Sequence, residues 1–93
     1  MKIKIYQADI NAKNKFMDLE FTNSHCGGVN KEDYRLVFEG HVVASNLEDV
    51  FCAFNRGRAP DGYKGHSMSV SDIIVNDAGA FYCDCFGFKR IEF

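Results

Sequence analysis

The chain has 93 residues, of which 46% are hydrophobic, 14% aromatic and 26% charged, with a formal net charge of −2. This length suits one domain with a modest core, and the high aromatic content excludes an intrinsically disordered chain. The near-neutral charge disfavours general binding to nucleic acid or to anionic membranes. We therefore expect residues 1–93 to form a single domain.

The N-terminal segment lacks the features of a targeting sequence. Polar and apolar side chains alternate from Met1 to Tyr6, without the apolar run and cleavage site of a signal peptide. No apolar run approaches the roughly 18 residues that a membrane span needs. We therefore expect a cytoplasmic protein with no membrane contact, in which the four cysteines are free thiols.

The first predicted strand is Lys2–Ala8, because its residues alternate and place Ile3, Ile5 and Gln7 on one face. Three less regular segments follow: a polar turn, a stretch that fits a short helix or a strand equally, and a loop (residues 9–14, 15–21 and 22–33).

The second predicted strand is Tyr34–Glu39. Its alternation places Tyr34, Leu36 and Phe38 on one face and Val37 on the other.

The clearest predicted helix is Ser45–Asn55. Ser45 and Glu48 match a capping box, in which each side chain bonds to the other residue's backbone amide. Four apolar residues at helical spacing form one stripe: Leu47, Val50, Phe51 and Phe54. Gly57 is the predicted helix stop.

The strongest strand signal is His66–Val75, where serines alternate with apolar residues. Asn76–Gly79 predicts a hairpin loop, and Ala80–Phe86 predicts the antiparallel return strand. Gly87 predicts a bend before a final strand, Phe88–Phe93. These elements predict an α+β fold, with a mostly antiparallel sheet of four or five strands and one main helix packed on one face.

Two segments of this hairpin carry a specific pattern of serines, Asp72 and Phe-Gly-Phe. They read Gly-Tyr-Lys-Gly-His-Ser-Met-Ser-Val-Ser-Asp-Ile-Ile-Val (62–75) and Gly-Ala-Phe-Tyr-Cys-Asp-Cys-Phe-Gly-Phe (79–88). The pattern resembles the signature of YodL-like domains, and the resemblance extends upstream to residues 34–40, 47–51 and 54–55. The signature positions are Ser67, Ser69, Ser71, Asp72, Asp84 and Gly87.

The resemblance implies a small intracellular accessory protein. Such domains occur as free-standing proteins of Gram-positive bacteria and as modules of large polyvalent proteins on conjugative elements and phages, beside antirestriction domains. The family carries over no catalytic site, and it implies binding to a host or mobile-element component. Cys83 and Cys85 depart from the family pattern, so the resemblance does not support a cysteine-dependent function.

A basic and aromatic loop leads into the hairpin. Its candidate partner-binding residues are Arg56, Arg58, Tyr63, Lys64 and His66. Such side chains suit an acidic protein surface or backbone phosphates. Our first hypothesis is a non-enzymatic protein that binds a host or mobile-element protein, and the alternative is a nucleic-acid-associated, antirestriction-type accessory protein. The edge of the last strand could also pair with a second copy in a homodimer.

Two chemical alternatives remain: a metal site and a hydrolase. Cys83 and Cys85 would share a strand face and could bind metal with a further ligand from His25, Cys26, His41 or His66. A second cysteine pair is missing, which favours free thiols.

The hydrolase alternative combines His66 and Asp72 with Ser67, Ser69 and Ser71. Neighbouring strand residues face opposite ways, and the G-x-S-x-G motif is absent. We therefore predict no catalytic residue, metal or cofactor. Asp72 should instead accept hydrogen bonds, with Arg56, Arg58 or Tyr63 as donor.

Overall fold

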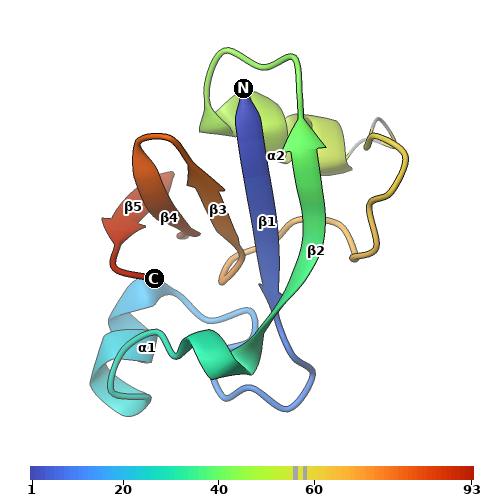
Figure 1. The fold of residues 1–93 in the computed structure, drawn as a ribbon. Helices are drawn as coiled ribbons and strands as arrows, with labels where there is room; N and C mark the ends of the chain where they lie inside the picture. The colour runs from blue at the N-terminus through green and yellow to red at the C-terminus, as the bar shows by residue number, and fades with distance from the viewer. Residues whose placement is uncertain (56, 58) are drawn as a thin grey trace.

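The computed structural model describes residues 1–55, 57 and 59–93. Two predicted partner-binding residues, Arg56 and Arg58, lie outside the described residues. The described part forms a five-stranded antiparallel sheet and two α-helices, which confirms the predicted α+β class (Figure 1). In chain order the elements are β1 (Lys2–Ala8), α1 (Leu19–His25), the 3₁₀ turn η1 (Lys31–Asp33), β2 (Tyr34–His41), α2 (Leu47–Asn55), β3 (Ile73–Asn76), β4 (Gly79–Cys83) and β5 (Phe88–Ile91).

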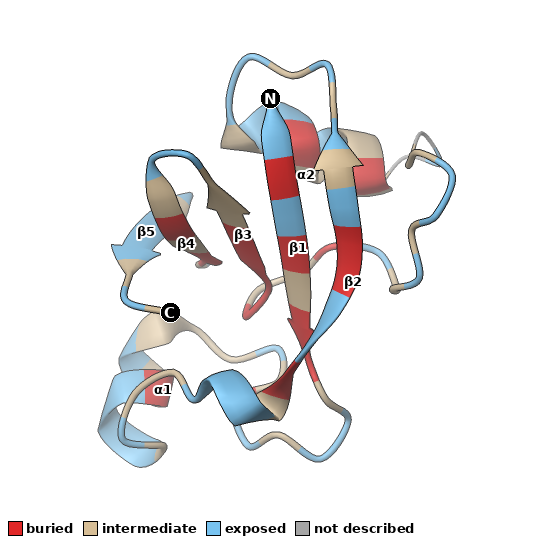
Figure 2. Ribbon diagram, viewed as in Figure 1, coloured by how far each residue is buried: buried red, intermediate tan, exposed pale blue. Residues whose placement is uncertain are grey.

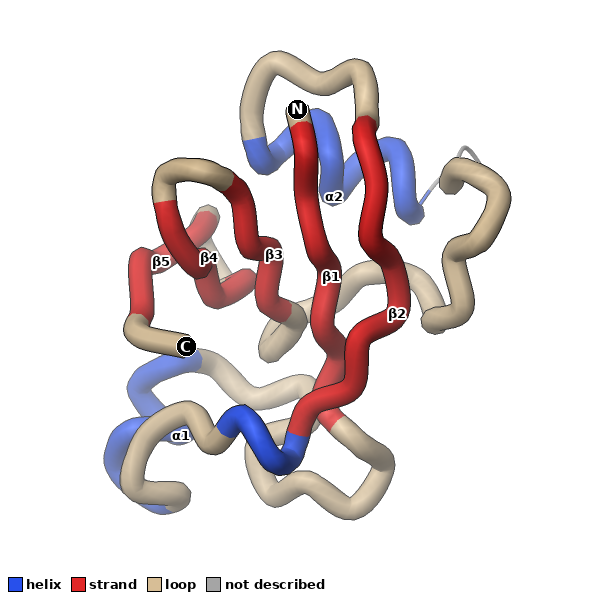
Figure 3. The backbone as a smooth tube through the Cα atoms, in the orientation of Figure 1, coloured by secondary structure: helices blue, strands red, loops and turns tan. Residues whose placement is uncertain are grey.

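The strand order is β2-β1-β3-β4-β5, so β2 and β5 form the two edges of the sheet (Figure 1). β1 pairs antiparallel with both β2 and β3. The long segment between α2 and β3 crosses behind β1 and β2 before it enters the sheet (Figure 3).

A buried cluster lies on each face of the sheet, and β1 contributes to both (Figure 2). On one face Ile3 and Ile5 pack against Val50 and Phe54 of α2. Leu19 of α1 and Ala12 of the preceding segment pack against the cluster on the other face, and its buried residues are Ala8, Tyr34, Ile73, Ala80 and Tyr82. The predicted face of β1 is confirmed, since Gln7 is also fully buried.

The predicted alternation of β2 is wrong beyond Arg35, because β2 contains a bulge. The register shifts so that Ile5 faces Phe38 while Tyr6 faces Leu36. The extra residue, Val37, joins Phe38 in the same core, and Leu36 is exposed. A bulge places two consecutive side chains on one face, which a period-2 pattern does not anticipate.

The helix α2 has the predicted apolar stripe but a different cap. Asn46, one residue later than predicted, accepts a hydrogen bond from the Asp49 amide at 2.8 Å. The Asp49 carboxylate reaches back to the Ser45 amide at 3.2 Å. Asn46 is therefore the N-cap, but the predicted capping box is not formed, because Asp49 bonds to the amide of Ser45 and not to that of the cap residue Asn46.

The strand predicted over His66–Val75 is wrong in its first half, because β3 begins only at Ile73. Ser71 adopts a φ of 87°, and the Asp72 amide donates to Ser69 O at 3.1 Å. A residue in the left-handed region cannot continue a pleated strand. The serines therefore belong to a turn that is joined to the end of β4 by the bond from the Ser71 amide to Cys83 O at 3.0 Å.

The return strand is shorter than predicted, because β4 ends at Cys83. The Asp84 amide donates to Gly87 O at 2.9 Å, and Gly87 has a φ of 82°. This tight turn confirms the bend predicted at Gly87 and sends the chain into β5.

The helix α1 occupies residues for which the sequence left helix or strand open and part of the predicted loop. Asp18 caps it by accepting a hydrogen bond from the Phe21 amide at 2.8 Å. Among the described residues, no helix has the length and hydrophobicity required to cross a bilayer.

Replacement of Phe54 by Ala should lower the free energy of unfolding by roughly 3–5 kcal/mol, because its side chain is 3% exposed in the core. Phe51 is only partly buried, so its replacement by Ala is the matched control and should cost clearly less. Urea denaturation of both variants measures the difference. Equal losses would contradict the packing of α2 described above.

Candidate functional site

A buried amide, that of Gln7, joins β1 to the loop before β3. Its Nε2 lies 3.0 Å from Tyr63 Oη, His66 O and Asp72 Oδ2, and its Oε1 accepts from the His66 amide at 3.2 Å. The side chain fills the space beside Gly65 so closely that a Cβ on residue 65 would collide with Gln7 Oε1. The loop therefore requires glycine at this point, although Gly65 has no positive φ.

Asp72 is the charged member of this network and is 1% exposed. Its Oδ2 accepts from Gln7 and, at 2.9 Å, from the Ser69 amide. Burial raises the pKa of Asp72 to about 6, although the Ser69 amide, the Gln7 amide and Lys15 act in the opposite direction. The prediction of Tyr63 as its donor is wrong, because the Tyr63 hydroxyl donates to His66 O.

A second buried polar cluster holds the segment before α1. The Tyr82 hydroxyl donates to Met17 O at 2.8 Å and lies 2.9 Å from Thr22 Oγ1. The Asn14 amide donates to Tyr34 Oη at 2.8 Å, and Tyr34 donates to Ser71 O at 2.7 Å. Burial raises the pKa values of both tyrosines. The two clusters meet at residues 71 and 72, so the serine turn is fixed from both sides.

Lys15 and His66 meet at the surface above this buried network. Lys15 Nζ donates to Ala8 O at 2.8 Å and lies 3.2 Å from His66 Nε2. His66 Nδ1 lies 2.7 Å from Ser67 O. A carbonyl only accepts, so Nδ1 carries the proton and Nε2 is free to accept from the ammonium group.

These two side chains line an open cleft of about 500 Å³ at the junction of β1 and β2. Arg35 and Asp9 also line it, with Arg35 Nε 3.9 Å from Asp9 Oδ1 and both side chains about half exposed. Ile10 is 86% exposed at the rim. The cleft thus combines two cations, carboxylates and an unprotected apolar side chain.

Phe16 stands beside the cleft in a strained conformation. Its φ is 66°, a genuine outlier for a bulky residue, and its side chain is 56% exposed. Its amide donates to Ser71 Oγ at 2.9 Å. Its ring lies 5.7 Å from that of His66 and 4.8 Å from Lys15 Nζ. Neighbouring groups therefore hold an aromatic ring at the surface.

The structure separates the predicted partner-binding residues. His66 lines the cleft, whereas Tyr63 is half-buried with its hydroxyl in the Gln7 network. Lys64 is exposed, and its amide donates to Val37 O at 2.9 Å beside the bulge of β2. Arg56 and Arg58 lie outside the described residues.

Four residues of this surface were not predicted from the sequence: Ile10, Lys15, Phe16 and Arg35. Their approach to His66 depends on long-range contacts, and no local pattern marks it.

The serine, histidine and aspartate side chains do not form a catalytic triad. Ser71 Oγ accepts from Phe16, and Asp72 bonds to Gln7 and Ser69. His66 contacts Lys15 and the carbonyl of Ser67, and no described serine hydroxyl bonds to it. The pair of hydrogen bonds that activates a serine nucleophile is missing from these contacts.

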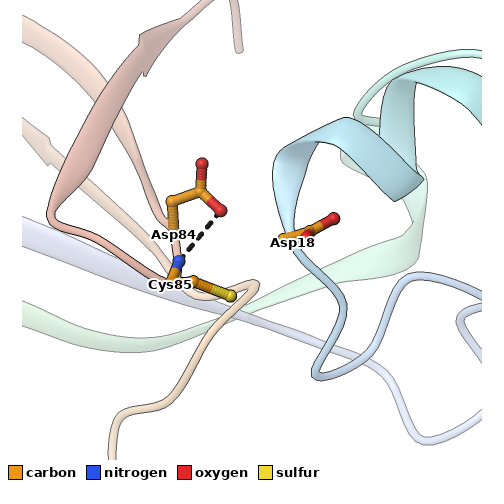
Figure 4. Close-up of side chains that lie close together, drawn as sticks. All are labelled: Asp18, Asp84 and Cys85. Atoms are coloured by element: carbon orange, nitrogen blue, oxygen red, sulfur yellow. Dashed lines mark hydrogen bonds between the residues drawn. The ribbon is translucent and has the colours of Figure 1, made fainter.

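Cys83 and Cys85 do not share a strand face as predicted, because β4 ends at Cys83. Cys83 is buried at the end of β4, and burial raises its pKa to about 12, which disfavours the thiolate. Cys85 and Asp84 lie in the turn after β4, opposite Asp18 at the start of α1, and the ligand atoms of the three residues are within 4.8 Å of one another (Figure 4). Both carboxylates already accept backbone amides: Asp18 from Phe21, and Asp84 from Cys85 at 2.9 Å. Asp84 also accepts from the Leu19 amide at 3.3 Å, at the start of the helix that Asp18 caps, so backbone hydrogen bonds account for this cluster.

Comparison with known families finds one family model that matches nearly the whole chain. The model of the YodL-like domain matches residues 2–93. No curated protein and no solved structure matches the chain.

Replacement of Asp72 by Asn should change how stability depends on pH. The folded pKa of about 6 exceeds the unfolded value of 3.8, so Asp72 contributes stability below about pH 4 that is lost as pH rises through 6. Between pH 4 and 7.5, the unfolding free energy of the wild type should fall by roughly 2–2.5 kcal/mol relative to Asp72→Asn. Urea denaturation of both proteins across this range gives the difference, and a constant difference would refute the buried, titrating carboxyl.

Proposed function

The chain belongs to the YodL-like domain family, and on this basis we propose that it is a small non-enzymatic accessory protein that binds another protein inside the cell. The partner is a component of the host or of a mobile element, as the family resemblance implies. The binding surface is the cleft formed by Lys15, Arg35 and His66, together with the exposed side chains of Ile10 and Phe16.

The conformation of Phe16 is the observation that carries the proposal. A positive φ costs a bulky residue on the order of 1–3 kcal/mol, and such strain concentrates at functional sites. An exposed ring adds no buried apolar surface to the hydrophobic core, so the core does not explain this strain. An aromatic side chain held at the surface suits an anchor that inserts into a pocket of a partner.

The cleft also indicates the polar chemistry of the partner. An ammonium group has three donors, and Lys15 uses two of them on Ala8 O and His66 Nε2. The remaining donor suits a carboxylate of the partner. We therefore expect a partner surface with an apolar pocket and an acidic residue beside it.

Replacement of Phe16 by Asn should weaken partner binding without loss of the fold, because Asn tolerates positive φ. Loss of an aromatic anchor costs 2 kcal/mol or more, so binding should weaken by about 30-fold. Val43 is fully exposed elsewhere on the surface, and Val43→Asn is the matched control.

Affinity capture from host cells with the wild type and both variants, followed by titration of the captured protein, tests this proposal. Proteins should be captured by the wild type and Val43→Asn and lost with Phe16→Asn. Identical capture by all three would exclude Phe16 as the anchor.

One observation favours the second candidate function, association with nucleic acid. A groove of about 330 Å³ on the α1 side of the sheet is lined by cations and aromatic residues, namely Lys4, Lys31, Arg90, Tyr6 and Phe93. Lys31 Nζ lies 5.2 Å from the centre of the Phe93 ring. Cations beside aromatic rings suit phosphates and bases of a single strand.

Replacement of Lys4 and Lys31 by Gln should weaken this association and flatten its salt dependence. Each phosphate contact contributes about −0.7 to the slope of log K against log salt for a single strand, so two lost contacts should reduce the slope by roughly 1.4. Titration of a fluorescent oligonucleotide at several salt concentrations measures it. Lys13→Gln, an exposed lysine outside the groove, is the control, and an equal effect of Lys13→Gln would exclude the groove.

A further inference from the structure

The outer edge of β5 is available for pairing with another strand. β5 is last in the strand order, and no backbone or side-chain hydrogen bond from the other described segments reaches Phe88–Ile91 on that side. The opposite edge, β2, is less suitable, because its bulge interrupts the ladder and Lys64 already bonds to Val37 O. An exposed strand edge is a template for an additional strand.

An apolar groove adjoins this edge on the α2 side of the sheet. It has a volume of about 260 Å³, and Phe51 of α2 and Phe88 of β5 line it. The two rings meet edge to face at 6.4 Å. In an antiparallel ladder, directly opposed residues share a face, so a residue opposite Phe88 would lie over this groove.

The charges of β5 indicate whether a second copy of the chain or a segment of another protein pairs with this edge. The strand reads Phe-Lys-Arg-Ile, and Lys89 and Arg90 are both exposed. If two copies paired antiparallel about the centre of β5, Lys89 of each copy would face Arg90 of the other. Like charges directly opposed are destabilising, which disfavours the homodimer raised by the sequence.

From this edge and these charges we infer that β5 docks an extended acidic segment of a partner protein by β-strand addition. The segment carries acidic residues opposite Lys89 and Arg90 and apolar residues opposite Phe88 and Ile91. Backbone hydrogen bonds supply affinity, and the charges and the groove supply specificity. The site lies apart from the cleft of Lys15 and His66, so its test is independent of the proposed protein-binding function; it shares Arg90 with the groove of the second candidate function.

The test uses a synthetic peptide, Thr-Leu-Glu-Glu-Leu-Thr, titrated into the full chain and followed by NMR. The amide signals of Phe88–Ile91 should shift, and those around His66 should not. A peptide with both Glu replaced by Lys should bind about tenfold more weakly, because two cross-strand pairs change from opposite to like charge. Methylation of alternate peptide nitrogens should abolish binding by blocking the ladder.

A charge-reversed variant, Lys89→Glu with Arg90→Glu, keeps the experiment decisive. It should bind the lysine peptide in preference to the acidic one, and this gain shows that the variant is folded. Equal affinity of the wild type for both peptides would overturn the inference, as would unchanged affinity after methylation. Dimerisation of the wild type through β5, seen by sedimentation and by the same NMR signals, would replace the acidic segment with a second copy.

Discussion

The hydrogen bonds of Gln7 are the constraint on which the candidate cleft depends. An amide buried in a hydrophobic core is tolerated only when its donors and acceptor are satisfied. Tyr63, His66 and Asp72 satisfy it, and all three come from the long segment before β3. The segment is therefore held against β1, and the His66 ring is carried to the surface beside Lys15.

The fold class could be predicted from sequence because its main elements have strong local patterns. β1 and α2 follow periods of 2 and 3.6, and the Asn76–Gly79 turn marks the hairpin. The errors arise where long-range contacts override the local pattern. The serines before Ile73 alternate like a strand, yet the hydrogen bonds of Ser71 to Cys83 and Phe16 impose a turn.

The candidate site was much less predictable than the fold. His66 was identified from its basic and aromatic neighbours, but its contacts come from residues 51 and 59 positions away, Lys15 and Gln7. The exposure of Phe16 follows from a left-handed φ, and the residue types beside it in the sequence do not predict that conformation. A buried Gln between apolar strand residues was the one available signal, because such an amide requires partners from elsewhere in the chain.

The separation between Gln7 and Asp72 has a consequence for synthesis of the protein. Their hydrogen bond spans 65 residues, so β1 leaves the ribosome long before its polar partner exists. β3 and β4, which extend the sheet from β1, emerge later still. At 5–20 residues per second, the nascent chain waits roughly 3–13 s with an unsatisfied amide in its future core. The domain therefore completes its folding only after β3 and β4 have emerged, and chaperones can bind the exposed apolar residues of β1 during this interval.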